Sequence, residues 1–207
     1  MGVGGKSMIT KTTDWTTEEM AAGCDFLAIA FLYGPIRLDP AVQAAWRDRL
    51  AAGDSHVWES WNAVAGALID EGGEQAAMDD FRQCLQVPIP GRYVPPYASM
   101  YVDAPATLWG PSTQRVRQWY EQGGLEWRRF QHIVAPDHVG IEWAFLAELS
   151  AHHTAETNAL RKRFVTEHIL RWLPAFVTRL EGVARGLYYP TLARWGIAWS
   201  EAIASAQ

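Results

Sequence analysis

The sequence predicts an all-α protein, and three features of its 207 residues carry this prediction. Apolar residues recur at intervals of three and four through most of the chain, which is the period of an amphipathic helix. No stretch alternates apolar and polar residues for long enough to form a convincing β-strand. The stretch 139–149 is apolar on nearly all sides, so we expect it to form a helix buried at the centre of the fold.

The chain is expected to begin with a short irregular segment, followed by one helical domain. We interpret residues 1–13 as a disordered start or a tag remnant, because their glycine spacing does not match a phosphate-binding loop. Thr16 and Glu19 form a capping box that opens the first helix, and Gly34-Pro35 ends it. Its inward stripe is predicted to be Met20, Cys24, Leu27 and Phe31. The predicted single domain is 14–207.

Three more helices are predicted before residue 88, separated by caps and breakers. Asp39-Pro40 begins the first, Asp54 or Ser55 begins the second, and Pro88 ends the third. Their inward positions are predicted to be Val42, Trp46, Leu50, Val57, Trp61, Val64, Leu68, Met78, Phe81 and Leu85.

Residues 87–112 interrupt the helical pattern with six prolines and several aromatic side chains. Proline fixes the backbone and removes an amide donor, so we expect a long irregular connection here. Because this connection is aromatic rather than polar, we predict that it packs onto the helices as part of a binding site. The alternative is a loop that only covers the core.

The C-terminal half is predicted to be helical again. A helix starts near Ser112 and ends at Gly123-Gly124, the stretch 125–135 is ambiguous, and the apolar helix follows Pro136. A long amphipathic helix over 161–180 and a last helix after Gly186 complete the chain. The inward stripe of the last helix is predicted to be Tyr188, Leu192, Trp195 and Trp199. We divide the domain into an N-terminal part 14–123, a hinge 123–136 and a C-terminal part 137–207. The chain could act as a monomer, or as a homodimer that exchanges halves at this hinge.

Composition and charge exclude several classes of protein. The net charge of −5 is spread over both signs along the chain, which argues against nucleic acid as a partner. No apolar run approaches the ~18 residues of a membrane span and no signal segment opens the chain, so we expect a cytoplasmic protein without membrane insertion. We expect Cys24 and Cys84 to be free, buried thiols. The eleven tryptophans either line a binding surface or fill a helical core.

No catalytic or metal-binding motif is present, and we predict no cofactor. Glu148, His152 and Glu156 fall on one helical face, but they stand in a charged stretch, so we expect them to be solvated rather than to bind a metal. His168 lies four residues before Trp172 in an apolar helix, which favours a satisfied core histidine.

Pro136, Asp137 and His138 stand at the mouth of the apolar helix. Asp137 is well placed to cap that helix, and His138 and Glu142 are four residues apart, which favours a hydrogen-bonded pair. Such a group could serve as a general base, although no nucleophile stands beside it in sequence. A small helical ligand-binding protein or enzyme that uses Asp137, His138 and Glu142 is therefore an alternative. A structural or regulatory oligomer, with the aromatic loop buried between subunits, is another.

Several stretches in the part of the chain after about residue 75, taken together, resemble the TorD/DmsD/NarJ group of redox-enzyme maturation chaperones. They are PPYASMY (95–101), LWGPSTQRVRQWYEQGGL (108–125), APDHVGIEWAFLAEL (135–149) and HILRWLPAFVTRLE followed by LYYPTLARW (168–195). The resemblance implies an all-helical cytoplasmic chaperone, not an enzyme. It also implies that the chain binds the twin-arginine leader of a molybdopterin oxidoreductase subunit and delays export until cofactor insertion.

The resemblance also implies which residues bind the peptide. The family's Asp-His pair falls on Asp137 and His138, and its aromatic-apolar cluster falls on Phe81, Cys84 and Leu85. Its Pro-Pro-aromatic segment falls on the stretch that comprises Pro95, Pro96, Tyr97, Ser99 and Tyr101.

A twin-arginine leader is a basic stretch followed by an apolar one, so it needs an apolar groove with acidic groups at one end. We expect Phe81, Tyr97 and Trp109 to line this groove, where their rings could also stack on guanidinium groups. We expect Asp137 to accept bidentate hydrogen bonds from an arginine. The predicted peptide-binding residues are Pro136, Asp137, His138, Glu142, Tyr97, Ser99, Tyr101, Trp109, Phe81 and Leu85.

Overall fold

The computed structural model describes residues 15–36, 41, 44–46, 48, 55–68, 72–130, 134–152 and 154–206. Within these ranges the regular structure is helical, and the only β-type pairing is an isolated antiparallel bridge between Tyr97 and His138. The predicted all-α fold is confirmed. The expected irregular start at 1–13 and most of the helix expected after Asp39 lie outside the described residues.

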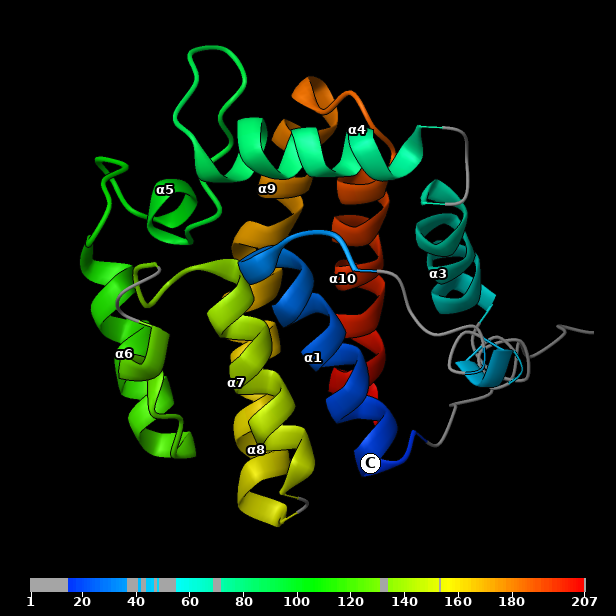
Figure 1. Cartoon of the computed structure of the whole chain (residues 1–207). Coiled ribbons are helices and arrows are strands. Elements are labelled where there is room, and N and C mark those ends of the chain that lie inside the picture. Colours follow the sequence, from blue (N-terminus) through cyan, green and yellow to red (C-terminus); the bar gives the residue numbers. More distant parts are fainter. Residues whose placement is uncertain are drawn as a thin grey trace, which may run out of the picture.

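Two helices form the centre of the fold: α1 (Thr17–Tyr33) and α7 (Val139–Ala151). They lie side by side in Figure 1. All of α7 is buried except Glu148 and Ala151, which confirms the predicted central helix. A Cβ atom at Gly140 would lie only 2.6 Å from Leu32 of α1, so glycine at this position permits the close approach of the two helices.

A second layer of helices packs behind this pair in the view of Figure 1. It consists of α8 (Ala155–Phe164), a π-helical turn η3 (Val165–Ile169), α9 (Leu170–Val183) and α10 (Tyr188–Ser205). The long helix predicted for 161–180 is therefore present but passes through a π-helical turn, and Pro174 lies inside α9 after that turn. The predicted inward stripe of the last helix is confirmed, because Tyr188, Leu192, Trp195 and Trp199 are fully buried.

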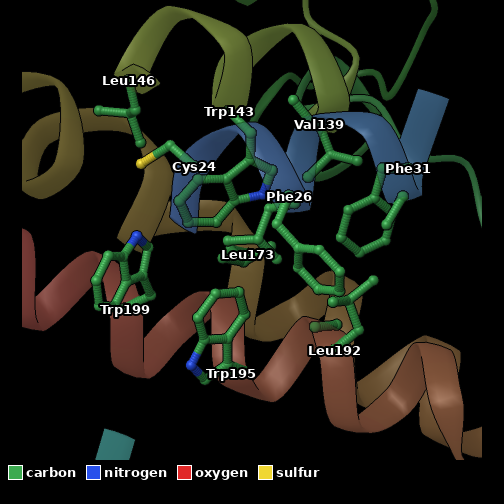
Figure 2. Close-up of a cluster of buried hydrophobic side chains, with 14 of the residues drawn as sticks. Cys24, Phe26, Phe31, Val139, Trp143, Leu146, Leu173, Leu192, Trp195 and Trp199 are labelled. Carbon is green, nitrogen blue, oxygen red and sulfur yellow. The ribbon is translucent and has the colours of Figure 1, made fainter. Parts of the chain in front are cut away.

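Tryptophans fill the core between α10 and α3 (Ser55–Ala67). The rings of Trp61 and Trp195 are tilted against each other with centroids 4.9 Å apart, and Trp195 stacks on Trp199 at 5.5 Å. Figure 2 shows Trp195 and Trp199 of α10 beside Trp143 and Cys24 of the central helices. At these positions tryptophan fills the core rather than lining a surface. Cys24 and Cys84 are free and buried, as predicted.

The remaining helices flank the central pair on two sides. α4 (Gly73–Asp80) continues into the π-helix η1 (Phe81–Gln86), and it runs horizontally above the upper end of α1 in Figure 1. α5 (Ser99–Val102), α6 (Pro111–Gly123) and the 3₁₀ turn η2 (Trp127–Phe130) follow. No helix in the described ranges combines the length and apolarity that crossing a membrane requires.

The predicted irregular connection after residue 87 is ordered by buried polar anchors. Asp80 is buried and accepts hydrogen bonds from the Arg92 side chain at 3.0 Å and from the backbone amides of Arg185 and Gly186 at 3.0 and 2.7 Å. One carboxylate therefore ties the connection to the turn between α9 and α10. This arrangement fixes η1 in place, and η1 carries two of the predicted peptide-binding residues.

Candidate functional site

The Pro-rich connection and the mouth of α7 meet as two extended segments. The amide of Val139 donates to the carbonyl of Pro96 at 2.8 Å, and the amide of Ala98 donates to the carbonyl of Asp137 at 3.0 Å. Between these two bonds Tyr97 and His138 form the isolated bridge, with ring centroids 5.2 Å apart. Two stretches that are distant in sequence are thus held together by their backbones.

A cavity of about 170 Å³ opens beside this bridge. Four of the predicted residues line it: Phe81 and Leu85 from η1, Tyr97 from the connection, and His138 from the mouth of α7. The other lining residues are Phe31, Leu32, Gln86 and Val134. Five of the eight lining side chains are apolar, but most of the surface that faces the open space is polar, and the walls come from four parts of the chain.

His138, not Asp137, caps α7. The Nδ1 atom of His138 accepts the backbone amide of Gly140 at 3.1 Å, and His138 adopts the extended backbone of an N-cap residue. The expectation that Asp137 caps this helix is therefore wrong. Burial lowers the pKa of His138 to about 3, so its ring is neutral at physiological pH and contributes a neutral wall to the cavity.

Asp137 faces away from the cavity and holds the connection. It is fully buried, and its Oδ2 accepts the backbone amide of Ser99 at 2.9 Å. Its Oδ1 has no hydrogen-bond partner among the residues that the structure describes. Bidentate binding of an arginine from outside is thus not open in this conformation, because the side chain of Asp137 is fully buried. On the other side, the hydroxyl of Tyr120 donates to the carbonyl of Pro136 at 2.8 Å.

Glu142 does not pair with His138. It is fully buried in α7, where Oε1 lies 2.7 Å from Nε2 of His168, and Oε2 accepts the indole N–H of Trp172 at 3.1 Å. Burial raises the pKa of Glu142, whereas His168 lowers it in part. His168 is therefore a satisfied core histidine, as predicted, and the predicted His138–Glu142 pair is wrong.

Asp137, His138 and Glu142 consequently do not converge on one space. Of the three, only His138 lines the cavity. The carboxylates of Asp137 and Glu142 instead accept hydrogen bonds from other groups of the protein. A cavity of about 170 Å³ is also smaller than the ~300–1,000 Å³ of usual small-molecule sites. The geometry therefore disfavours a small-molecule site built from these three residues.

Tyr101 and Trp109 were predicted to contact the peptide, and both lie outside the cavity lining. The hydroxyl of Tyr101 donates to the carbonyl of Pro95 at 2.9 Å, and its ring lies 5.5 Å from that of Trp172. Trp109 is 56% exposed in the turn before α6 and has a positive φ of 64°. Tyr101 thus supports the connection from behind, whereas Trp109 projects into solvent.

Sequence reasoning missed half of the cavity lining. Phe31 was predicted to lie on the inward stripe of the first helix, and it does contact Tyr189, at 5.8 Å between ring centroids. Nothing in a helical period distinguishes an inward residue that packs fully from one that also borders a cavity. Leu32, Gln86 and Val134 carried no separate signal. Among the described residues, no three His, Cys, Asp or Glu side chains are grouped so that they could hold a metal ion.

Comparisons with known proteins agree with this architecture. The family model of the nitrate reductase delta subunit matches residues 47–178. The Tat proofreading chaperone DmsD of Salmonella typhi is 27% identical over 177 residues, which cover 80% of this chain and 79% of the relative.

Two further relatives match about half of their own length. The chaperone protein TorD of Shewanella pealeana is 30% identical over 111 residues, covering 50% of this chain and 48% of the relative. TorD of Vibrio cholerae strain N16961 is 36% identical over 103 residues, covering 45% and 46%. These relatives are named as chaperones, not as enzymes. Because the family model spans more than half of the chain, this protein belongs to the nitrate reductase delta subunit family, the group of TorD- and DmsD-type maturation chaperones.

Proposed function

We propose that this protein is a cytoplasmic chaperone that binds the twin-arginine leader of a molybdopterin oxidoreductase subunit. By holding the leader, it delays export of the subunit until the cofactor has been inserted. The names of the relatives support this role, since DmsD is called a Tat proofreading chaperone.

The cavity beside the Tyr97–His138 bridge is the observation that carries the proposal. It is open to solvent, and although much of its surface is polar, the apolar side chains of Phe81 and Leu85 form part of its wall and suit a side chain from the apolar part of a leader. The volume of about 170 Å³ accommodates one large side chain rather than a whole peptide. The neutral ring of His138 adds no charge that would oppose an apolar ligand.

The two backbone segments give the cavity its shape. Asp137 and Ser99 hold the connection against the mouth of α7, so we assign them a positioning role behind the wall. Pro136 and Tyr101 have the same role, through the hydroxyl of Tyr120 and the carbonyl of Pro95. Moderate affinity is expected, because a flexible leader loses conformational entropy on binding.

Filling the cavity tests this function. Val134 is half-buried in the wall, so Val134→Trp adds bulk to the cavity without placing a charge in the core. We expect it to weaken binding of a fluorescent leader peptide more than tenfold in an anisotropy titration, with an unchanged melting temperature.

Val87→Trp is the matched control, because Val87 is 51% exposed and lies outside the cavity lining. This variant should bind the leader as the parent protein does. Equal affinities for Val134→Trp and the parent protein would show that the leader binds elsewhere.

A further inference from the structure

The cavity is continued on one side by an exposed stripe of α1. The exposed residues of this helix recur at intervals of four, three, four and four: Glu18, Ala22, Asp25, Ile29 and Tyr33. Such spacing places all five on one face. In Figure 1 this helix lies at the front, and no described helix crosses over it.

The end of the stripe nearest the cavity is apolar. Ile29 and Tyr33 are 42% and 59% exposed, which is unusual for large apolar side chains four residues apart on one helix. Leu32 stands between them in sequence and forms part of the cavity wall. Because residues three apart are neighbours on a helix, Ile29 stands beside Leu32, which is itself buried in the cavity wall.

The other end of the stripe is acidic. Asp25 is exposed one turn before Ile29, and it lies close enough to Glu148 of α7 for the two carboxylates to interact. Partial burial raises the pKa of Asp25, Arg129 lowers it, and Glu148 raises it by a smaller amount. The Arg129 guanidinium stacks 4.8 Å from the Phe130 ring and offsets only part of this negative charge.

We propose that the exposed stripe of α1 is a docking surface for the same leader, with the apolar stretch of the leader on Ile29 and Tyr33 and its arginines at Asp25 and Glu148. This inference rests on the proposed function. Its basis is that the order of surfaces along α1, apolar beside the cavity and acidic beyond, is complementary to a basic stretch joined to an apolar one. The paired carboxylates suit guanidinium groups, which form bidentate hydrogen bonds.

The dimensions set the register of the leader. Eight helical residues separate Asp25 from Tyr33, which corresponds to about 12 Å along the axis. An extended peptide covers this distance with about four residues at roughly 3.3 Å each. We therefore expect the arginines to stand about four residues before the side chain that contacts Tyr33, if the leader binds in an extended form.

Two labelled synthetic peptides test the proposal on the full chain. One carries two adjacent arginines followed by a leucine-rich stretch, and the other has glutamines in place of the arginines. Asp25→Asn combined with Glu148→Gln should weaken binding of the arginine peptide about three- to tenfold and leave the glutamine peptide unaffected. Raising the salt concentration should reproduce this selective loss in the parent protein.

The apolar part of the surface is tested separately. Ile29→Ser combined with Tyr33→Ser should weaken both peptides by about tenfold. Leu187→Ser and Glu201→Gln are matched controls at exposed positions of the α10 region, and we expect no effect from either. The substituted positions are exposed, so all variants should keep the melting temperature of the parent protein.

The outcomes separate this inference from the proposed function. If Val134→Trp abolishes binding while the α1 variants bind both peptides normally, the leader uses the cavity alone and the stripe proposal is overturned. If the Ile29 and Tyr33 variant changes only the oligomeric state on gel filtration, the stripe is a contact between copies of the chain, and the proposal is again overturned. If the parent protein binds neither peptide, both proposals fail.

Discussion

The wall of the cavity and the polar network behind it arise from the same short stretch of sequence, yet they have different properties. His138 borders the cavity with a neutral ring, whereas Glu142, one helical turn later, is fully buried and bound to His168 and Trp172. Of two residues four apart in sequence, one thus borders the cavity and the other stabilises the core. Substitutions in the wall should change binding, and substitutions in the network should change stability.

The largest effect on stability is expected at Glu142. Glu142→Ala removes the acceptor for the buried groups of His168 and Trp172, so we expect a loss of about 3–5 kcal/mol in the free energy of unfolding. Because 1 kcal/mol corresponds to roughly 2–4 °C for a chain of this size, the melting temperature should fall clearly. Glu148→Ala on the same helix is the control, because its side chain is 39% exposed and should have little effect. Equal melting temperatures for the two variants would contradict the stabilising role assigned to the buried network around Glu142.

His138 should give the wall a pH dependence of its own. Its pKa in the folded protein is about 3, below its ordinary value of 6.5, so the unfolded chain takes up a proton first as the pH falls. The contribution to stability is therefore complete above pH 6.5 and is lost between pH 6.5 and 3. At pH 5 the loss is about 2 kcal/mol, from 1.5 pH units at 1.36 kcal/mol each.

His138→Asn removes this titration while keeping an acceptor that can cap α7. Urea unfolding at pH 7 and pH 5 should show a smaller loss of stability for this variant than for the parent protein. His152→Asn, at an exposed position, should behave like the parent protein. The same pH dependence for His138→Asn and the parent protein would place the titration elsewhere.

Asp137 adjoins His138 of the cavity wall but is itself buried. Two variants separate its positioning role from direct binding of its charge to the leader. Asp137→Ala leaves the Ser99 amide without its acceptor, which costs about 1–3 kcal/mol, whereas Asp137→Asn keeps an acceptor oxygen. We expect both variants to remain folded and Asp137→Ala to bind the leader more weakly. A parallel loss of melting temperature and leader affinity would support positioning alone. Loss of affinity in Asp137→Asn without loss of stability would instead indicate direct binding of the charge to the leader.

The smallest effect is expected at Trp109, outside both regions. Its φ of 64° is unfavourable for any residue other than glycine, and its side chain is 56% exposed. Trp109→Gly should therefore raise stability slightly, by at most about 1 kcal/mol, in urea unfolding. Leader affinity should not change, and a marked loss of affinity would extend the binding surface to this turn.

Local pattern predicted much of the fold. The capping box at Thr16 and Glu19, the buried helix after Val139 and the inward stripe of α10 all follow from short-range spacing, and all are present. Gly124 ends α6 in a left-handed conformation, close to where the glycine pair predicted an end.

Partners across helices could not be predicted in the same way. The partner of Glu142 is 26 residues away in sequence, and the partner of Asp137 is 38 residues away. A helical period shows which residues share a face but not which residue of another helix meets that face. The predicted cap by Asp137 and the predicted His138–Glu142 pair were wrong for this reason, whereas Phe81, Leu85, Tyr97 and His138 do meet at one cavity.

Hydrogen–deuterium exchange of the full chain, with and without a twin-arginine leader peptide, tests the central claim most directly. We predict slower exchange on peptide binding in three places: residues 81–87, 96–99 and 134–139. The α10 stretch 188–199, packed in the tryptophan core, should be unchanged. Protection confined to other parts of the chain, or none at a peptide concentration that saturates binding, would contradict the assignment of the leader to this cavity.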